Sequence, residues 1–273
     1  MQAASRESYA AARQRLDAYA GAAAADEVAS TGDQIGLVAG LLRREPRLRR
    51  ALSDPARAGE DRVGLLGNLV GDKIGADARE LLGTLVGGRW SAPSELLAGT
   101  ERLGVEALLA SADRAGELGE VEDELFRFGQ LVAANPELSN VLSDPIAPVA
   151  QRAELTGSLL AGKASAVTVK LVEVALAGFG GRSFTGALTR LVELAADRRD
   201  RQVAYVTVAA PLSDDEERRL GAKLTELYGR EVSVKQTVDP SVLGGLSVRI
   251  GSDLYDGTIL RRLTDTRNAL AKR

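Results

Sequence analysis

Apolar residues recur at helical spacing from the N-terminus to about Asp200. In the clearest segment, Val167, Leu171, Val174 and Ala175 fall at positions i, i+4, i+7 and i+8, so they share one face of a helix. A second stripe of this kind comprises Phe184, Ala187, Leu188, Leu191 and Ala195. Pro and Gly residues interrupt the stripes and predict the helix ends. This part of the chain is therefore predicted to consist of amphipathic helices.

The predicted helical part contains an internal repeat. Residues 45–48 (EPRL) and 52–55 (LSDP) return as residues 135–138 (NPEL) and 142–145 (LSDP), at a constant offset of 90 residues. Arg62 and Lys73 return at the same offset as Arg152 and Lys163, and Gly87-Gly88-Arg89 returns after a small insertion as Gly180-Gly181-Arg182. A repeat on this scale indicates a duplicated structural unit.

Each copy of the repeat is predicted to form a compact bundle of about six short helices. In the second copy, residues 105–118 and 121–133 each carry a helical stripe, and Asn135-Pro136 and Asp144-Pro145 bracket a very short helix. Short connections favour antiparallel neighbours. We predict two tandem six-helix bundles, in residues 1–104 and 105–201.

The period of the pattern changes after Asp200. Residues 203–208 are rich in β-branched and aromatic side chains and predict a strand, and Ser213 and Glu216 predict a capping box at the start of a helix. Alternation at 232–234 and 246–250 predicts two more strands. The turn Asp256-Gly257 then precedes a last helix, capped by Thr258, with the apolar residues Ile259, Leu260, Leu263 and Leu270. The predicted fold is mostly α with a small α/β C-terminal module of βαββα type in residues 202–273.

The composition excludes several kinds of chemistry. The 273 residues include no Cys and no His, which removes thiolate nucleophiles, imidazole bases and the usual zinc ligands, so we expect no cofactor and no metal. A net charge of -3 gives no general attraction to nucleic acid. The N-terminus is polar, and no apolar run approaches the roughly 18 residues of a membrane span. We therefore expect a cytoplasmic protein that reaches a membrane only through partners.

One segment matches the spacing of a nucleotide-binding phosphate loop. Gly157, Gly162 and Lys163 have that spacing, but Ala164 replaces the hydroxyl that would bind magnesium. A phosphate loop follows a strand, whereas the residues around Gly157 continue a helical stripe. The segment is more typical of the end of a helix, and we expect no nucleotide binding there.

The C-terminal module contains a more specific pattern. Residues 238–251 (VDPSVLGGLSVRIG) and 256–263 (DGTILRRL) place paired glycines beside a strand and an Asp-Gly turn before a helix. This pattern closely resembles the signature of ATP synthase delta subunits, whose mitochondrial counterpart is the oligomycin-sensitivity-conferring protein. The residues that carry the resemblance are Asp239, Pro240, Gly244, Gly245, Arg249, Asp256, Gly257, Arg261 and Leu263.

The resemblance implies a structural role in the peripheral stalk, or stator, of the proton-translocating rotary ATP synthase. In that family a six-helix bundle holds N-terminal helices of the alpha subunits on the catalytic head, and the C-terminal region holds the b subunits. The implied protein is non-catalytic and peripheral, on the cytoplasmic face of the cell membrane. This chain departs from most of the family because it carries two bundles.

The resemblance places the helix-accepting groove between the first and fifth helices of a bundle. Here these helices are residues 9–20 and 76–86 in the first copy, and 105–118 and 167–178 in the second. The candidate contact residues are Tyr9, Leu16, Leu82, Leu85, Leu108, Leu109, Leu171 and Ala175. The same stripes could instead build only the bundle core. Two alternative functions are a phosphate-loop NTPase and a helical scaffold with other partners.

Overall fold

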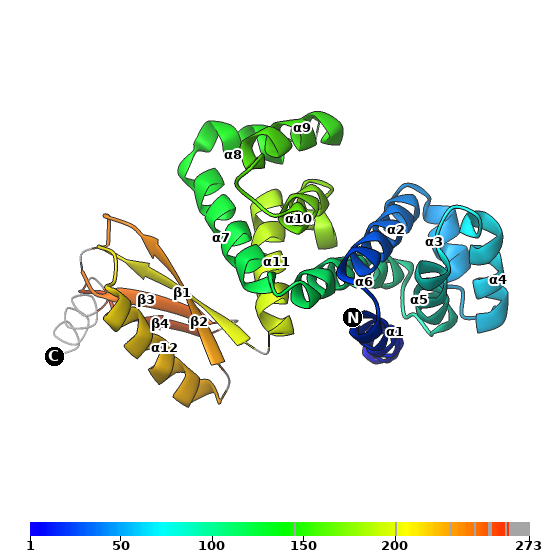
Figure 1. Cartoon of the computed structure of the whole chain (residues 1–273), viewed down its shortest axis with the longest axis horizontal. Coiled ribbons are helices and arrows are strands. Elements are labelled where there is room, and N and C mark those ends of the chain that lie inside the picture. Colours follow the sequence, from blue (N-terminus) through cyan, green and yellow to red (C-terminus); the bar gives the residue numbers. More distant parts are fainter. Residues whose placement is uncertain are drawn as a thin grey trace, which may run out of the picture. The chain divides into compact units, whose positions relative to one another are not determined.

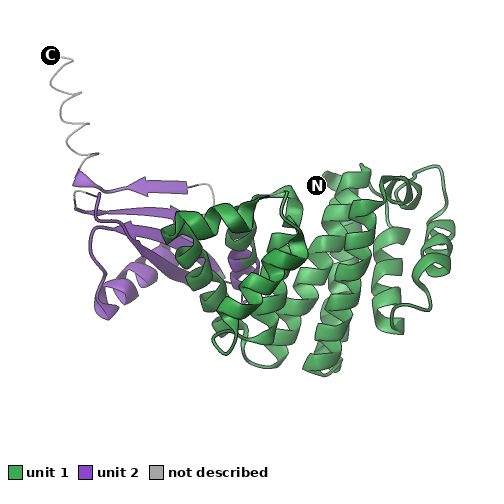
Figure 2. Cartoon of the chain, turned by 90° about the horizontal axis from the view of Figure 1, so that it is seen from above, with its two compact units in different colours: residues 1–191 green, residues 192–273 purple. Residues whose placement is uncertain are grey.

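The computed structural model describes residues 1–144, 146–199, 201–229, 231–242, 244–250, 253–259 and 261. Within it the chain divides into two compact units, Met1–Leu191 and Val192–Arg273 (Figure 2). The boundary falls inside one helix, α11 (Phe184–Arg198). The first unit is helical, and the second contains the sheet, which confirms the predicted fold class.

The helices of the first unit form two successive sets (Figure 1). The first set is α1 (Ala3–Ala22), α2 (Ala25–Arg44), α3 (Pro46–Leu52), α4 (Gly59–Val70), α5 (Ala76–Gly87) and α6 (Pro93–Arg114). The second set continues with α7 (Leu118–Ala134), α8 (Pro136–Ser143), α9 (Val149–Leu160), α10 (Ala166–Leu176), the 3-10 turn η1 (Phe179–Gly181) and α11. The helices α3, α4 and α5 begin 90 residues before α8, α9 and α10, so the sequence repeat is also a structural repeat.

Helix α6 belongs to both sets. It runs without a break through residues 104 and 105, where the sequence pattern placed the division between the bundles. It follows α5 as the sixth helix of the first copy and precedes α7 as the first helix of the second copy. The two six-helix bundles therefore share a helix.

Both copies use the same contact to fix the start of the fifth helix. In the first copy, Gln34 of α2 accepts a hydrogen bond from the backbone N–H of Gly75. In the second copy, Glu124 of α7 accepts bonds from the N–H of Ser165 at 3.0 Å and from the hydroxyl of Thr168 at 2.6 Å. These bonds satisfy groups at a helix N-terminus that have no partner within the helix.

The core of the first copy is closed at the α5–α6 connection by Trp90. Its ring N–H donates to the backbone oxygen of Leu85 at 2.8 Å, and only 5% of the residue is exposed. A Cβ at Gly99 would lie 2.5 Å from the Trp90 ring, so glycine is required there for the ring to fit. Trp90 thus has the packing role that its position at a helix junction indicates.

The second unit contains a four-stranded sheet in the order β2-β1-β3-β4. Its strands are β1 (Arg201–Val208), β2 (Glu231–Val238), β3 (Leu246–Ile250) and β4 (Asp253–Asp256). Strand β1 pairs with β2 in parallel and with β3 in antiparallel register, and β3 and β4 are antiparallel. Alternate side chains of β1, β2 and β3, among them Val206 and Val248, form a core with Leu224 of helix α12 (Asp214–Tyr228).

The predicted start of α12 is confirmed. Ser213 and Glu216 form the predicted capping box, and Gly229 ends the helix with a φ of 67°. Strand β4 was not predicted, because its four residues are all exposed and show no alternation. The predicted last helix begins at Thr258, and its residues after Arg261 lie outside the described residues.

Candidate partner-binding surfaces

The eight predicted contact residues are buried within the chain. Each has at most 5% of its surface exposed. Tyr9 and Leu16 lie on α1, Leu82 and Leu85 on α5, Leu108 and Leu109 on α6, and Leu171 and Ala175 on α10. An apolar stripe at helical spacing is common to a core face and to a groove. In this structure these side chains pack inside the helical unit. A partner helix would therefore contact the exposed residues of the same helices instead.

On α1 and α5 the exposed neighbours are small or charged. Ala11, Arg15 and Ala18 lie on one exposed side of α1, spaced by four and three residues. Arg15 forms an ion pair with Glu80 of α5, which places this side of α1 towards α5. We call the surface formed by Ala11, Arg15, Ala18, Glu80 and Thr84 the outer α1/α5 face.

A buried polar cluster holds α1 against α6. The Tyr9 hydroxyl donates to Glu106 at 3.4 Å, and the Arg102 guanidinium lies 4.8 Å from the centre of the Tyr9 ring. Arg102 and Arg13 also face the Glu106 carboxylate, at 3.4 Å and 4.0 Å. Burial, followed by the negative charge of Glu106, raises the pKa of Tyr9 above its ordinary value. The hydroxyl therefore stays protonated and keeps its hydrogen bond.

Helix α2 packs closely along α6. A Cβ at Gly32 would lie 3.1 Å from Leu108 and 3.2 Å from both Ala107 and the backbone oxygen of Gly104. Near the other end of α2, Arg43 bonds Glu101 of α6 at 2.8 Å. Residue numbers rise along α2 as they fall along α6, so the two helices are antiparallel. Small residues at the crossing allow the backbones to approach.

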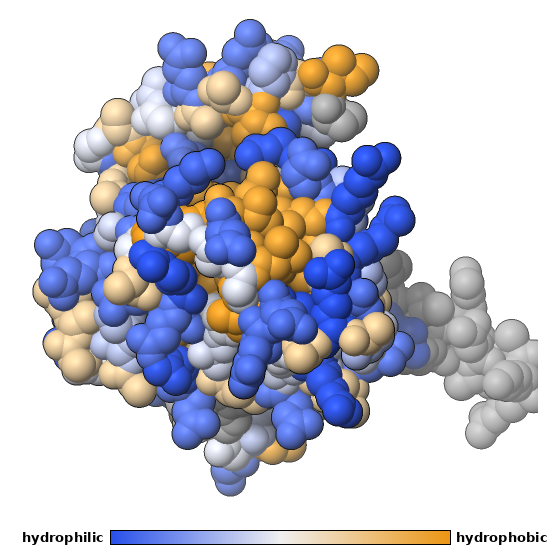
Figure 3. Space-filling view, turned by 90° about the vertical axis from the view of Figure 1, so that its right-hand side faces the viewer, coloured by the Kyte–Doolittle hydropathy of each residue, from blue (hydrophilic) through white to orange (hydrophobic). Residues whose placement is uncertain are grey.

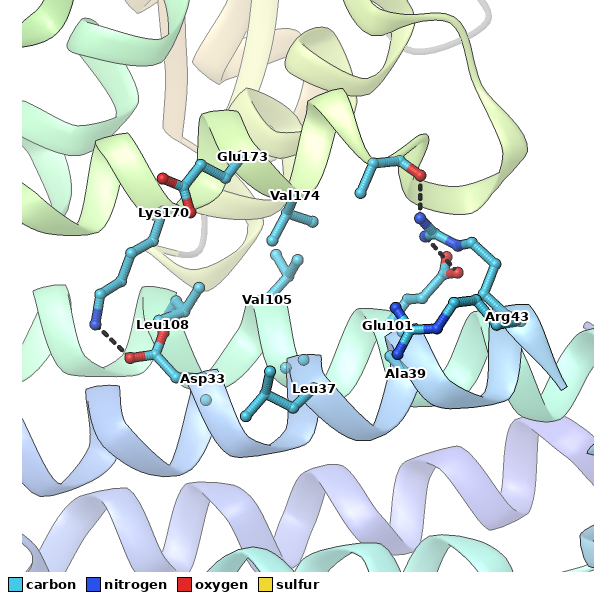
Figure 4. Close-up of a pocket in the computed structure, with 16 residues that line it drawn as sticks. Asp33, Leu37, Ala39, Arg43, Glu101, Val105, Leu108, Lys170, Glu173 and Val174 are labelled. Carbon is cyan, nitrogen blue, oxygen red and sulfur yellow. Dashed lines mark hydrogen bonds and ion pairs between the residues drawn. The ribbon is translucent and has the colours of Figure 1, made fainter. Parts of the chain in front are cut away.

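A cavity of about 390 Å³ lies between α2, α6 and α10 (Figure 4). Leu37, Val105 and Val174 come from the three helices and point into it. At one end Asp33 of α2 pairs with Lys170 of α10. At the other end Arg43 pairs with Glu101 and also donates to the backbone oxygen of Ala177, just beyond α10. We call this space the α6/α10 cavity.

A further apolar surface lies at the end of the helical unit that carries α3, α4 and α5. Figure 3 shows apolar side chains gathered there among hydrophilic ones. Val63 and Leu69 of α4 are 36% and 42% exposed. Leu69 has the counterpart Leu159 at the same offset of 90 residues in α9. Both copies therefore keep a leucine at this position.

In the sheet unit, the paired glycines of the signature allow two segments to meet. Gly244 and Gly245 have φ values of 85° and 78°, which glycine adopts readily. The N–H of Ile259 donates to the oxygen of Gly244 at 3.1 Å. A Cβ at Gly245 would lie 2.5 Å from the oxygen of Gly257. The glycines are therefore required for the close approach of the segment after β4.

The aspartates of the signature shape turns. Asp239 accepts bonds from the N–H and hydroxyl of Ser241, and Asp256 accepts the same pair of bonds from Thr258. These bonds hold the pKa of both carboxyl groups below their usual range. Pro240 follows Asp239 in its turn, the Arg249 guanidinium lies 4.7 Å from the centre of the Tyr205 ring, and the N–H of Arg261 donates to Thr258. Leu263 lies outside the described residues.

The segment with phosphate-loop spacing does not have the structure that a phosphate loop requires. Gly157 lies inside α9, and a short turn links α9 to α10 around Lys163. In the described residues no group of three or more acidic, His or Cys side chains is arranged to hold a metal ion. Among the described helices, none combines the length and apolar character needed to cross a membrane.

The helical repeat and the sheet signature agree with the comparisons to known proteins. The sequence model of the family described as ATP synthase delta (OSCP) subunit matches residues 105–270. The chain is 73% identical over its whole length to the ATP synthase subunit delta of Salinispora arenicola, and 71% identical to that of Salinispora tropica, with both relatives also covered completely. It is 47% identical to that of Streptomyces avermitilis, over 98% of each chain. The chain therefore belongs to the ATP synthase delta (OSCP) subunit family.

The family match begins inside α6. It thus covers the second helical copy and the sheet unit, and it leaves most of the first copy outside. The full-length alignments with the Salinispora proteins include residues 1–104 as well. The first copy is therefore a feature that this chain shares with these relatives.

Proposed function

We propose that the chain is a stator subunit in the peripheral stalk of the proton-translocating rotary ATP synthase. In this role it links the N-terminal helices of the alpha subunits, at the top of the catalytic head, to the b subunits. The observation that carries the proposal is its full-length similarity to proteins named ATP synthase subunit delta, together with the family match. The subunit acts on the cytoplasmic face of the cell membrane, as a peripheral protein.

The proposed role is mechanical and non-catalytic. A stator resists the torque of the rotor, and it needs two firm attachments for this. A groove that accepts an amphipathic helix provides such an attachment through apolar contact and shape, without a titratable catalytic group. The division of the chain into a helical unit and a sheet unit supports two separate attachments.

We assign the alpha subunits to the helical part and the b subunits to the sheet unit. The assignment follows the family resemblance, and the domains it implies are residues 1–104, 105–201 and 202–273, with α6 common to the two helical domains. In the first copy the accepting surface is the outer α1/α5 face. Its alanines leave room for a partner helix to approach closely, and the pair Arg15–Glu80 supplies charges that can orient it.

Binding measurements on the full-length chain test this assignment. The probes are a peptide of the N-terminal residues of the alpha subunit and the C-terminal segment of the b subunit, titrated separately. Ala18→Arg on the outer α1/α5 face is expected to weaken alpha peptide binding at least tenfold and to leave b binding unchanged. Ala10→Arg is the control, because Ala10 is also exposed on α1 but faces away from Arg15.

Two results would contradict the proposal. Absence of binding to both probes by the folded chain would exclude the link between head and stalk. Equal loss of alpha peptide binding in the Ala18 and Ala10 variants would exclude the outer α1/α5 face as the accepting surface.

A further inference from the structure

The two copies do not offer equivalent surfaces to a partner. Helix α6 is the first helix of the second copy, and α10 is its fifth, so α6 and α10 correspond to α1 and α5 of the first copy. The side of α6 and α10 that carries Val105 and Val174 faces α2 of the same chain. On the outer α1/α5 face, in contrast, Ala11, Arg15 and Ala18 are exposed.

Helix α2 is held at both edges of the α6/α10 cavity. On the α6 side it is held by the close approach of Gly32 to Gly104. On the α10 side it is held by the Asp33–Lys170 ion pair and by the bond from Arg43 to the oxygen of Ala177. The contacts to α10 stand at opposite ends of the cavity, so α2 lies across the whole length of the space (Figure 4).

Helix α2 already occupies the position from which a partner helix would reach α6. With α2 in place, only 1% of Val105 is exposed and Val174 is half-buried. Gly32 of α2 also lies directly against Leu108 and Gly104 of α6. A partner helix would therefore have to displace α2 before it could lie along α6 and α10.

We propose that α2 is the resident occupant of the helix-accepting side of α6 and α10, so that the chain accepts one partner helix, on the outer α1/α5 face, rather than two. This inference rests on the proposed function. The duplication then does not double the attachment to the head. The accepting surface then lies on α1 and α5 of the first copy, and α2 covers the corresponding surface of α6 and α10 in the second copy.

The covering by α2 can be tested without any partner. The chain contains no Cys, so a single introduced thiol is the only one present. Val174→Cys places it in the cavity and Ala18→Cys places it on the outer α1/α5 face. A maleimide carrying a long polyethylene glycol chain is far larger than the cavity. We expect it to modify Cys at position 174 at least tenfold more slowly than at position 18, and equally fast after denaturation.

A charge reversal tests the contacts that hold α2. Asp33→Lys places two cations together at Lys170, and we expect at least threefold faster modification at position 174. Asp26→Lys makes the same charge change on an exposed residue of α2 that lies outside the cavity lining, and is expected to leave the rate unchanged. In the chain that keeps Asp33, modification at position 174 as fast as at position 18 would overturn the proposal that α2 covers α6 and α10.

Titration with the alpha peptide then counts the sites. One peptide per full-length chain is expected, and two would overturn the inference. Failure to bind any peptide would refute the proposed function alone, because the modification rates would still decide whether α2 covers α6 and α10.

Discussion

Replacing Gly32 with alanine tests the close packing of α2 on α6. The new Cβ would lie 3.1 Å from Leu108 and 3.2 Å from the backbone oxygen of Gly104, which is tighter than ordinary contact. Gly36 lies one turn further along α2, and a Cβ there would meet nothing within 4 Å. The two substitutions are therefore a matched pair in one helix, and they differ in whether α6 stands in the way.

The expected difference is about 2 kcal/mol. Alanine in place of glycine inside a helix stabilises by roughly 1 kcal/mol, and Gly36→Ala should show this gain. At Gly32 the same gain is offset by overpacking, which costs about 1–3 kcal/mol in a close-packed interior. Since the backbone oxygen of Gly104 cannot move aside as a side chain can, we expect Gly32→Ala to destabilise the helical unit by about 1 kcal/mol.

Equilibrium unfolding in urea measures both changes. The two units need not unfold together, so the signal should report the helical unit alone. Trp90 is the one tryptophan of the chain and lies in the core of the first copy, so its fluorescence is suitable. Equal stabilisation by both substitutions would refute the close approach of α2 and α6, and with it the covering of the α6/α10 cavity.

Substitutions at three further positions test single contacts. Glu124→Ala removes the bonds to the start of α10 and should destabilise the helical unit by about 2 kcal/mol, whereas Glu124→Gln, which copies Gln34 of the first copy, should cost about half as much. Tyr9→Phe should cost about 1 kcal/mol near neutral pH. Because the pKa of Tyr9 is raised on folding, the wild type should lose stability as the pH rises above about 10, and the variant should lose less. Gly245→Ala should destabilise the sheet unit by more than about 2 kcal/mol, because of its φ of 78° and its contact with Gly257.

Each of these predictions has its own contradicting result. For Glu124 it is unchanged hydrogen exchange in the first turn of α10 in the alanine variant. For Tyr9 it is a parallel loss of stability at alkaline pH in the wild type and the phenylalanine variant. For Gly245 it is an unchanged melting transition of the sheet, or a change that appears equally in the fluorescence of Trp90.

The sequence pattern predicts the helices well because most of them bury one face. The stripe of Leu171 and Ala175 and the repeat around Pro46 and Pro136 indicate both the helical part and its duplication, and the structure confirms them. The pattern does not reveal that α6 is shared between the copies. A repeat gives the spacing of elements along the chain, and whether one helix completes two bundles depends on packing between segments far apart.

The same limit applies to the candidate surfaces. Hydrophobic spacing places Leu108 and Leu171 on inward faces, but it cannot distinguish a core from a groove that awaits a partner. The pair Asp33–Lys170 joins residues 137 positions apart, and each alone is an ordinary surface charge. In the sheet unit the sequence indicates the signature glycines, but the contact of Gly245 with Gly257 joins segments whose approach depends on the folded sheet.

A map of the assembled ATP synthase containing this chain would test the stator role in place. The stator role predicts the chain at the top of the peripheral stalk, with its sheet unit on the b subunits and one alpha N-terminal helix along Ala11 and Ala18 of α1. The covering by α2 predicts α2 seated between α6 and α10, with no alpha-subunit helix at Val174. A map with the chain away from the stalk, or without contact to both the alpha and b subunits, would contradict the stator role.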